Sequence, residues 1–137
     1  MQHYSPLPRL VFPALTIAIC VGCGAGNVER EAVYPVVGSL LFEGRPAVGA
    51  IVTFHRATGA PIGEPVRAEV GADGQFTPIR PDGAVGAAAG RYALTVEWPD
   101  DGIDRLHGQY ANSLQPLAET EVTAGANLLR PLSIPSR

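Results

Sequence analysis

The chain has 137 residues, of which 46% are hydrophobic and 17% are charged. This length fits one domain with short tails, and the hydrophobic fraction excludes an intrinsically disordered chain. All ten basic residues are arginines spread along the sequence, and the formal net charge is −3. A nucleic-acid-binding protein is expected to show a basic stripe, so we expect no nucleic-acid partner. The 16 glycines and 13 prolines favour many short elements joined by tight turns.

Residues 1–22 are typical of a cleaved signal peptide. Arg9 is the only charged residue before a mostly apolar run over residues 10–22. This run is too short to span about 30 Å of hydrocarbon comfortably, and Pro13 would weaken a stable helix within it. We therefore predict a segment that is removed from the mature protein.

The apolar run ends in a motif that resembles a bacterial lipobox. Gly22 provides the small residue that precedes the lipid-accepting cysteine, and Cys23 is that cysteine. Cys20 occupies the position where leucine is usual, and it fits the acceptor role less well because Ile19 precedes it. The sequence predicts that the mature chain begins at Cys23 and carries lipid there. We expect the protein in the cell envelope, facing the periplasm or the exterior, with the membrane as a partner.

The pair Cys20 and Cys23 also matches the spacing of a redox CxxC motif or half of a zinc site. Redox motifs of this kind open a helix after a strand, and zinc sites need two further ligands; neither context is present. No cysteine follows Cys23, so an intramolecular disulfide is excluded in the mature chain. Residues 23–33, rich in small and polar side chains, are predicted to be a short tether.

Alternating hydrophobicity over residues 34–98 predicts a series of short strands. The first is expected over residues 34–42 and the second over 48–55, forming a hairpin across the turn at 43–46. A weaker strand is expected at 64–70 and another at 75–79, where Pro78 indicates an edge position or the end of the strand. Residues 91–98 alternate over their whole length, which predicts a half-buried strand with Tyr92 and Trp98 facing inward.

The last third of the chain is predicted to hold a long insertion and two final strands. The insertion covers residues 99–116 and includes an expected helical turn at 104–110. Strands are predicted at 120–123 and 128–134, across a turn at 124–127. The whole pattern predicts an all-β fold, an antiparallel sandwich of about seven strands over residues 34–135.

Several short motifs resemble the carboxypeptidase regulatory-like, or transthyretin-like, domain found in small bacterial lipoproteins. The resemblance covers residues 33–134 and rests on the order and spacing of the following segments: Tyr34-Pro-Val-x-Gly38, Phe42-Glu-Gly-Arg-Pro46, Gly49-Ala-x-Val-x-Phe54, Ala72-Asp-Gly-Gln-Phe76, Gly90-Arg-Tyr-x-Leu-x-Val96-x-Trp-Pro99 and Asp104-Arg-Leu-x-Gly-x-Tyr-Ala-Asn112. The resemblance implies a seven-stranded prealbumin-like sandwich without an established catalytic role.

Candidate ligand-binding residues gather in the insertion. Asp100, Asp101 and Asp104 carry hard oxygen ligands of the kind that hold Ca²⁺, although their spacing differs from that of a twelve-residue calcium loop. Asp104 is also a natural N-cap. Tyr110 is a candidate for stacking on a sugar ring, whereas the alternation places Trp98 in the core. The histidines His55 and His107 are expected at the surface or in hydrogen bonds.

Two functions follow from these observations. The first is a non-catalytic, lipid-anchored envelope protein whose sandwich serves as a structural or protein-interaction module, with exposed strand edges that accept a partner strand. The alternative is a small-ligand module that binds glycan or calcium. Because no nucleophile or acid–base constellation is present in the sequence, we expect no enzyme, no cofactor and no catalytic metal.

Overall fold

The computed structural model describes residues 31–57 and 64–136, and these residues form thirteen strands and no helix. The predicted signal peptide and Cys23 lie outside this described part. Within it, nothing forms a helix long and apolar enough to cross a membrane. The all-β prediction is therefore confirmed for the described residues.

Most of the strands are short, in agreement with the many turn residues. In chain order they are β1 (Val33–Tyr34), β2 (Val36–Phe42), β3 (Arg45–Pro46), β4 (Ile51–Arg56), β5 (Val66–Glu69), β6 (Gln75–Phe76), β7 (Ala87–Ala88), β8 (Gly90–Glu97), β9 (Pro99–Asp100), β10 (Ile103–Asp104), β11 (Ala118–Val122), β12 (Asn127–Leu128) and β13 (Leu132–Ile134).

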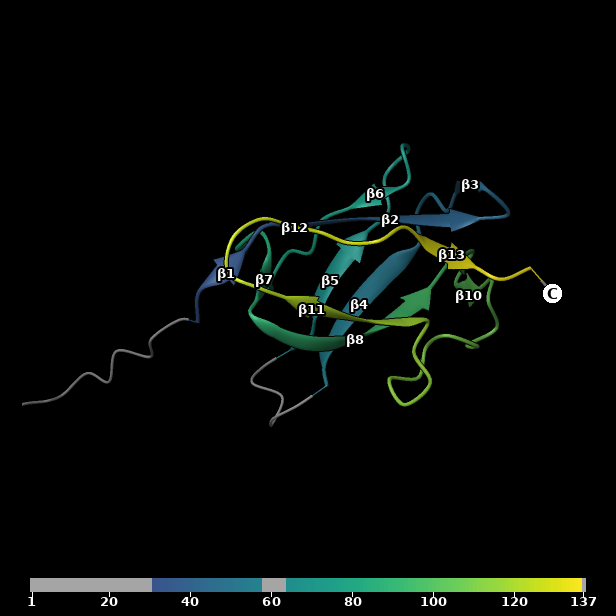
Figure 1. Cartoon of the computed structure of the whole chain (residues 1–137). Coiled ribbons are helices and arrows are strands. Elements are labelled where there is room, and N and C mark those ends of the chain that lie inside the picture. Colours follow the sequence, from purple (N-terminus) through teal and green to yellow (C-terminus); the bar gives the residue numbers. More distant parts are fainter. Residues whose placement is uncertain (1–30, 58–63, 137) are drawn as a thin grey trace, which may run out of the picture.

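Two main sheets enclose the core (Figure 1). One sheet is antiparallel and has the order β11-β8-β4-β5. The other is built around β2, which pairs with β3, β6, β12 and β13. Between them, Phe54 of β4 makes edge-to-face ring contacts with Phe76 of β6 and with Tyr92 of β8. This arrangement of two facing layers is consistent with a sandwich.

The inward faces predicted from the alternation are the buried ones. Val36 and Leu40 of β2 are fully buried, as are Val52 and Leu94 on the facing sheet. Apolar side chains at every second position place one face of each strand against the other sheet, and burial of each side chain stabilises the fold by about 1.5–3 kcal/mol.

The predicted hairpin between the first two long strands is wrong. Glu43 and Gly44, both with positive φ, close a two-residue turn of the kind that joins tight hairpins, but the returning strand is only β3. Pro46 has no N–H to continue the ladder. The chain then crosses to the opposite sheet, where Val70 N donates to Ala50 O, and β4 pairs with β5 and β8.

The prediction of purely antiparallel pairing is also wrong. The two C-terminal strands, β12 and β13, both run parallel to β2. After β11 the chain turns back to the start of β2, where Asn127 N donates to the carbonyl of Pro35. Because β12 begins beside the start of β2, it runs in the same direction as β2. Hydrophobic alternation does not report strand direction, since the side chains of both kinds of pair alternate with the same period.

Two local predictions need revision in the same region. Ala93 and Thr95 of β8 are buried although they face away from the core, because β8 is a central strand flanked by β4 and β11. Of residues 104–110, Asp104 ends β10 and 105–110 form successive turns and no helix, and the positive φ of His107 interrupts any helical repeat.

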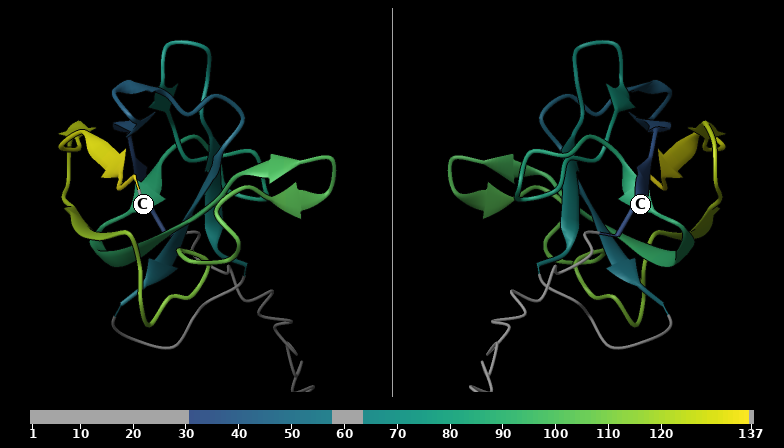
Figure 2. Two further views of the ribbon diagram at one scale, coloured as in Figure 1. Left: turned by 90° about the vertical axis from the view of Figure 1, so that its right-hand side faces the viewer. Right: turned by 90° about the vertical axis from the view of Figure 1, so that its left-hand side faces the viewer.

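The first strand and the last one lie at opposite ends of the molecule. In Figure 1, β1 and β7 lie at the left-hand end, where the chain enters, and β3 and β13 lie at the right-hand end. Figure 2 shows the β9–β10 hairpin standing away from the two sheets. We call the end with β1 the N-terminal end.

Candidate functional site

Two arginines fasten the start of the described chain at the N-terminal end. Arg56 Nη2 lies 2.5 Å from Glu31 Oε2, and Arg80 donates from Nη1 to the Glu31 carbonyl at 2.9 Å. Arg80 also pairs with Asp82. Beyond Glu31, β1 pairs with β7, so residues 31–33 of the predicted tether already contact the domain. The point at which the tether joins the domain is therefore fixed.

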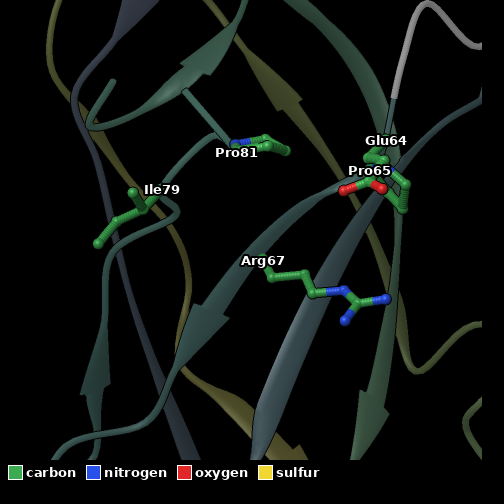
Figure 3. A pocket seen from close by; sticks show the side chains of 5 residues that line it. All are labelled: Glu64, Pro65, Arg67, Ile79 and Pro81. Atoms are coloured by element: carbon green, nitrogen blue, oxygen red, sulfur yellow. The ribbon is translucent and has the colours of Figure 1, made fainter. Parts of the chain in front are cut away.

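A shallow hollow of about 430 Å³ lies beside this end, on the side of β5. Its lining combines one cation, one carboxylate and three apolar side chains: Arg67, Glu64, Pro65, Ile79 and Pro81. In Figure 3, the Arg67 side chain extends from β5 toward the same side as Glu64 and Pro65. Arg67 is exposed, and no ion pair within the described ranges engages its guanidinium.

The hollow belongs to a continuous row across the outer face of the four-stranded sheet. Directly opposed pairs link Thr95 to Thr53, Thr53 to Arg67, and Arg67 to Ile79. A further bridge joins Ile79 to Val85. Directly opposed residues project to the same face of a sheet, so Ile79 follows Arg67 in this row and Val85 follows Ile79. The exposed fractions of Ile79 and Val85 are 52% and 57%.

His55 lies on the same outer face. Its Nε2 atom is 2.9 Å from Thr95 Oγ1, in a hydrogen bond between side chains. Burial, and then the positive charge of Arg67, lower the pKa of His55 below its usual value of 6.5. The neutral imidazole is therefore the favoured form, and the sequence-based expectation of a hydrogen-bonded histidine is confirmed.

Asp104 organises the insertion through three backbone hydrogen bonds. Its Oδ1 accepts from Trp98 N at 2.8 Å and from Leu106 N at 3.0 Å, and its Oδ2 accepts from Gly108 N at 2.8 Å. Partial burial by itself would raise the pKa of Asp104, but these three donors outweigh it and the net shift is downward. Asp104 thus has the predicted capping role, but it caps a series of turns and not a helix.

We expect Asp104→Asn to lower the free energy of unfolding by about 2 kcal/mol near pH 7, because an amide has one acceptor oxygen and loses charge-assisted hydrogen bonds. The folded-state pKa of Asp104 lies below its unfolded value, so its contribution is complete above about pH 4 and is lost as the pH falls through the folded pKa. Urea unfolding from pH 7 to pH 2 should show the gap between the two proteins closing in acid. A constant gap would contradict this role.

The other candidate residues of the insertion are separated from one another. Asp100 and Asp101 are exposed on the β9–β10 hairpin, and no group of three metal-ligating side chains forms among the described residues. Tyr110 is half-buried and packs against the core. Its carbonyl accepts from Val96 N at 2.9 Å.

Trp98 is a core residue, as the alternation predicted. It is 8% exposed, donates from Nε1 to Val48 O at 2.9 Å and meets Phe42 edge to face. The Arg105 guanidinium lies 4.0 Å from the centroid of its ring. The ring is thus covered on several sides and is not an open platform for a sugar.

Sequence reasoning missed the β9–β10 hairpin, although its signal was present. Asp101 and Gly102 both have positive φ and join Asp100 to Ile103. An Asp-Gly pair is a strong indication of a two-residue hairpin turn. The flanking residues did not alternate clearly enough to draw attention to it.

The strand β11 forms an edge of the four-stranded sheet. Ala57 N donates to Arg91 O, so the odd-numbered residues of β8 direct their backbone groups toward β4 and the even-numbered ones toward β11. Glu119 and Glu121 of β11 lie opposite odd-numbered residues of β8. Their N–H and C=O groups therefore point outward from the sheet, and both side chains are exposed.

Comparisons with known proteins give little beyond this geometry. No family model matches the chain, and no curated protein matches it significantly. Among solved structures, a DUF3823 family protein from Parabacteroides merdae ATCC 43184 aligns with a TM-score of 0.46 and 18% identity. The alignment covers 76% of this chain and 46% of that protein, so the chain spans less than half of its length.

Proposed function

We propose that the protein is a lipid-anchored, non-catalytic envelope protein whose β-sandwich binds a protein partner through the open edge of β11. The finer assignment, a prealbumin-like domain of the carboxypeptidase regulatory-like kind, belongs to the same proposal. This domain assignment is supported by the sequence motifs and by the two facing sheets. The anchor is supported by the lipobox at Cys23.

The observation that carries the interaction role is the outward-directed backbone of Glu119 and Glu121. An edge strand with unpaired N–H and C=O groups accepts an added strand through main-chain hydrogen bonds. Glu119 lies 4.0 Å from Arg91 in an exposed ion pair, so the exposed carboxylate of Glu121 in particular favours a partner strand that carries arginine or lysine. Both glutamates also disfavour pairing with a second copy of β11, since antiparallel pairing would bring glutamates of the two copies together.

The anchor is tested by Cys23→Ser. Without a thiol for diacylglycerol transfer, the variant should lose radiolabelled lipid completely and accumulate as uncleaved precursor. Cys20→Ser is the matched control and should retain lipid, cleavage and membrane attachment. Normal cleavage together with normal membrane attachment of Cys23→Ser would overturn the proposed anchor.

The edge is tested by Glu121→Pro, which removes an outward N–H and blocks strand addition while leaving the ladder to β8 intact. A photo-crosslinking residue at position 119 in intact cells should recover one consistent protein, and Glu121→Pro should abolish this product. We expect Glu121→Pro to change the unfolding free energy by less than about 1 kcal/mol.

Thr120→Pro is the informative comparison, because Thr120 lies opposite Tyr92 and its N–H points into the sheet. It should lower the unfolding free energy by about 2 kcal/mol through the lost ladder bond and the unpaired carbonyl of β8. Repeated recovery of no partner at position 119, or equal recovery with Glu121→Pro, would contradict an edge-binding role.

A further inference from the structure

The tether limits how far the domain can lie from its membrane. Eight peptide units separate Cys23 from Glu31, which gives a reach of roughly 28 Å when fully extended. A folded domain of this size is roughly 34 Å across. Since Arg56 and Arg80 hold Glu31 at the N-terminal end, this end stays within roughly 28 Å of the bilayer when the anchor is inserted, and short tether conformations bring it against the headgroups.

The exposed side chains next to this attachment point are unusual for a free surface. Arg80 binds Glu31, and its neighbour Ile79 projects into solvent beside Val85, its direct cross-strand partner. Pro65 and Pro81 continue the apolar surface around the hollow. We call the surface formed by Pro65, Arg67, Ile79, Pro81 and Val85 the Arg67 face.

The chemistry of the Arg67 face fits the interface of a zwitterionic bilayer. Apolar side chains at such an interface enter the boundary between headgroups and acyl chains, to a depth of about 5–10 Å. The guanidinium of Arg67, which forms no ion pair with any described carboxylate, binds a lipid phosphate well, since it offers paired N–H donors. Glu64 at the side of the hollow complements the ammonium group of the same headgroup. The chain has no polybasic segment that would favour anionic lipid instead.

We propose that the Arg67 face rests on the headgroup layer of the membrane that holds the anchor, with Arg67 on a phospholipid phosphate and Ile79 and Val85 inserted beside it. This inference rests on the lipid anchor proposed above. It also places β9–β10, near the end of the domain opposite β1, away from the membrane and open to solvent.

The test attaches the chain to vesicles without the cell. Cys23 is the only cysteine of residues 23–137, so this chain can be coupled through its thiol to a maleimide lipid in vesicles of phosphatidylcholine and phosphatidylethanolamine. Trp98 is the only tryptophan, so Trp98→Phe gives a protein without tryptophan fluorescence, into which a single reporter can be placed. Val85→Trp then reports on the Arg67 face, and Ile103→Trp, at a side chain that is 67% exposed on β10, is the matched control.

Lipids brominated near the headgroup end of the acyl chain quench only tryptophans in contact with the interface. We expect quenching of the Val85→Trp variant to be at least about threefold stronger than that of the Ile103→Trp variant. Adding Arg67→Gln to Val85→Trp should reduce its quenching by about half, because the phosphate contact is lost. If Trp98→Phe unfolds the domain, Trp98 is retained in both reporter variants. Its fluorescence is then the same in both, and the difference in quenching still reports on the introduced tryptophans.

Equal quenching at the two positions, or none in the Val85→Trp variant on vesicles that carry the coupled protein, would overturn the proposal. Such a result would indicate that the Arg67 face contacts a protein partner and not the membrane. Because the coupling is chemical, the outcome does not depend on lipidation in cells, which the Cys23→Ser experiment tests separately.

Discussion

Gly38→Ala is expected to lower the free energy of unfolding by about 3 kcal/mol, because a methyl group at this position would overlap a buried aromatic ring. A Cβ atom on Gly38 would lie 2.7 Å from Cε2 of Phe76 and nearer still to Cζ. Phe76 is 2% exposed and packs against Phe54, so its ring has no free space into which to move. Gly38 and Phe76 are direct partners in the pairing of β2 with β6.

A double-mutant cycle separates this overlap from a general effect on the strand. Phe76→Leu shortens the side chain that meets the new methyl group, so Gly38→Ala should cost at least about 1 kcal/mol less in the Phe76→Leu background than in the wild type. Chemical denaturation of the four proteins measures the difference. Strictly additive effects would show that the ring is not what excludes a side chain at position 38.

Gly86→Ala is expected to destabilise the domain by about 3 kcal/mol or more, and no neighbouring side chain can be shortened to relieve it. Gly86 has a φ of 120°, and a Cβ atom there would lie 2.8 Å from the carbonyl carbon of Tyr34 and closer to its oxygen. Both the left-handed conformation and the overlap with backbone oppose any L side chain. The substitution should therefore separate β7 from β1 and loosen the start of the domain.

Gly83→Ala is the matched control for this prediction. Gly83 has a φ of 88°, and its Cβ direction meets nothing within 4 Å. It should therefore show the conformational cost alone, about 1 kcal/mol. Hydrogen exchange at Val33 and Ala88 in Gly86→Ala should be much faster than in the wild type, while Gly83→Ala should leave it unchanged. Similar melting curves for the two variants would contradict the close approach of Gly86 to Tyr34.

Some of the candidate site could be predicted from residue types and some could not. Asp104 was predicted to cap a local turn, because Asp at the start of a polar segment accepts nearby N–H groups. Its hydrogen bond to Trp98 N spans a hairpin, which local patterns did not reveal. The Arg67 face could not be predicted, since it joins β5 to Ile79 and Val85 through isolated bridges.

The sequence by itself determined which side chains face the core and where the chain turns. Alternation in β2, β4 and β8 placed Leu40, Phe54 and Tyr92 inside, because a strand's side chains repeat every two residues whatever its partner. The motif at Cys23 likewise predicts the anchor from local residues alone, and it remains a prediction because it lies outside the described residues.

Only the tertiary structure decided which strands pair and in which direction. The first two long strands lie in different sheets, and β12 and β13 run parallel to β2. Pairing depends on backbone hydrogen bonds between segments far apart in sequence, and these bonds are the same for every residue type except proline. For this reason the open edge of β11 and the contacts that hold Glu31 became visible only in the folded molecule.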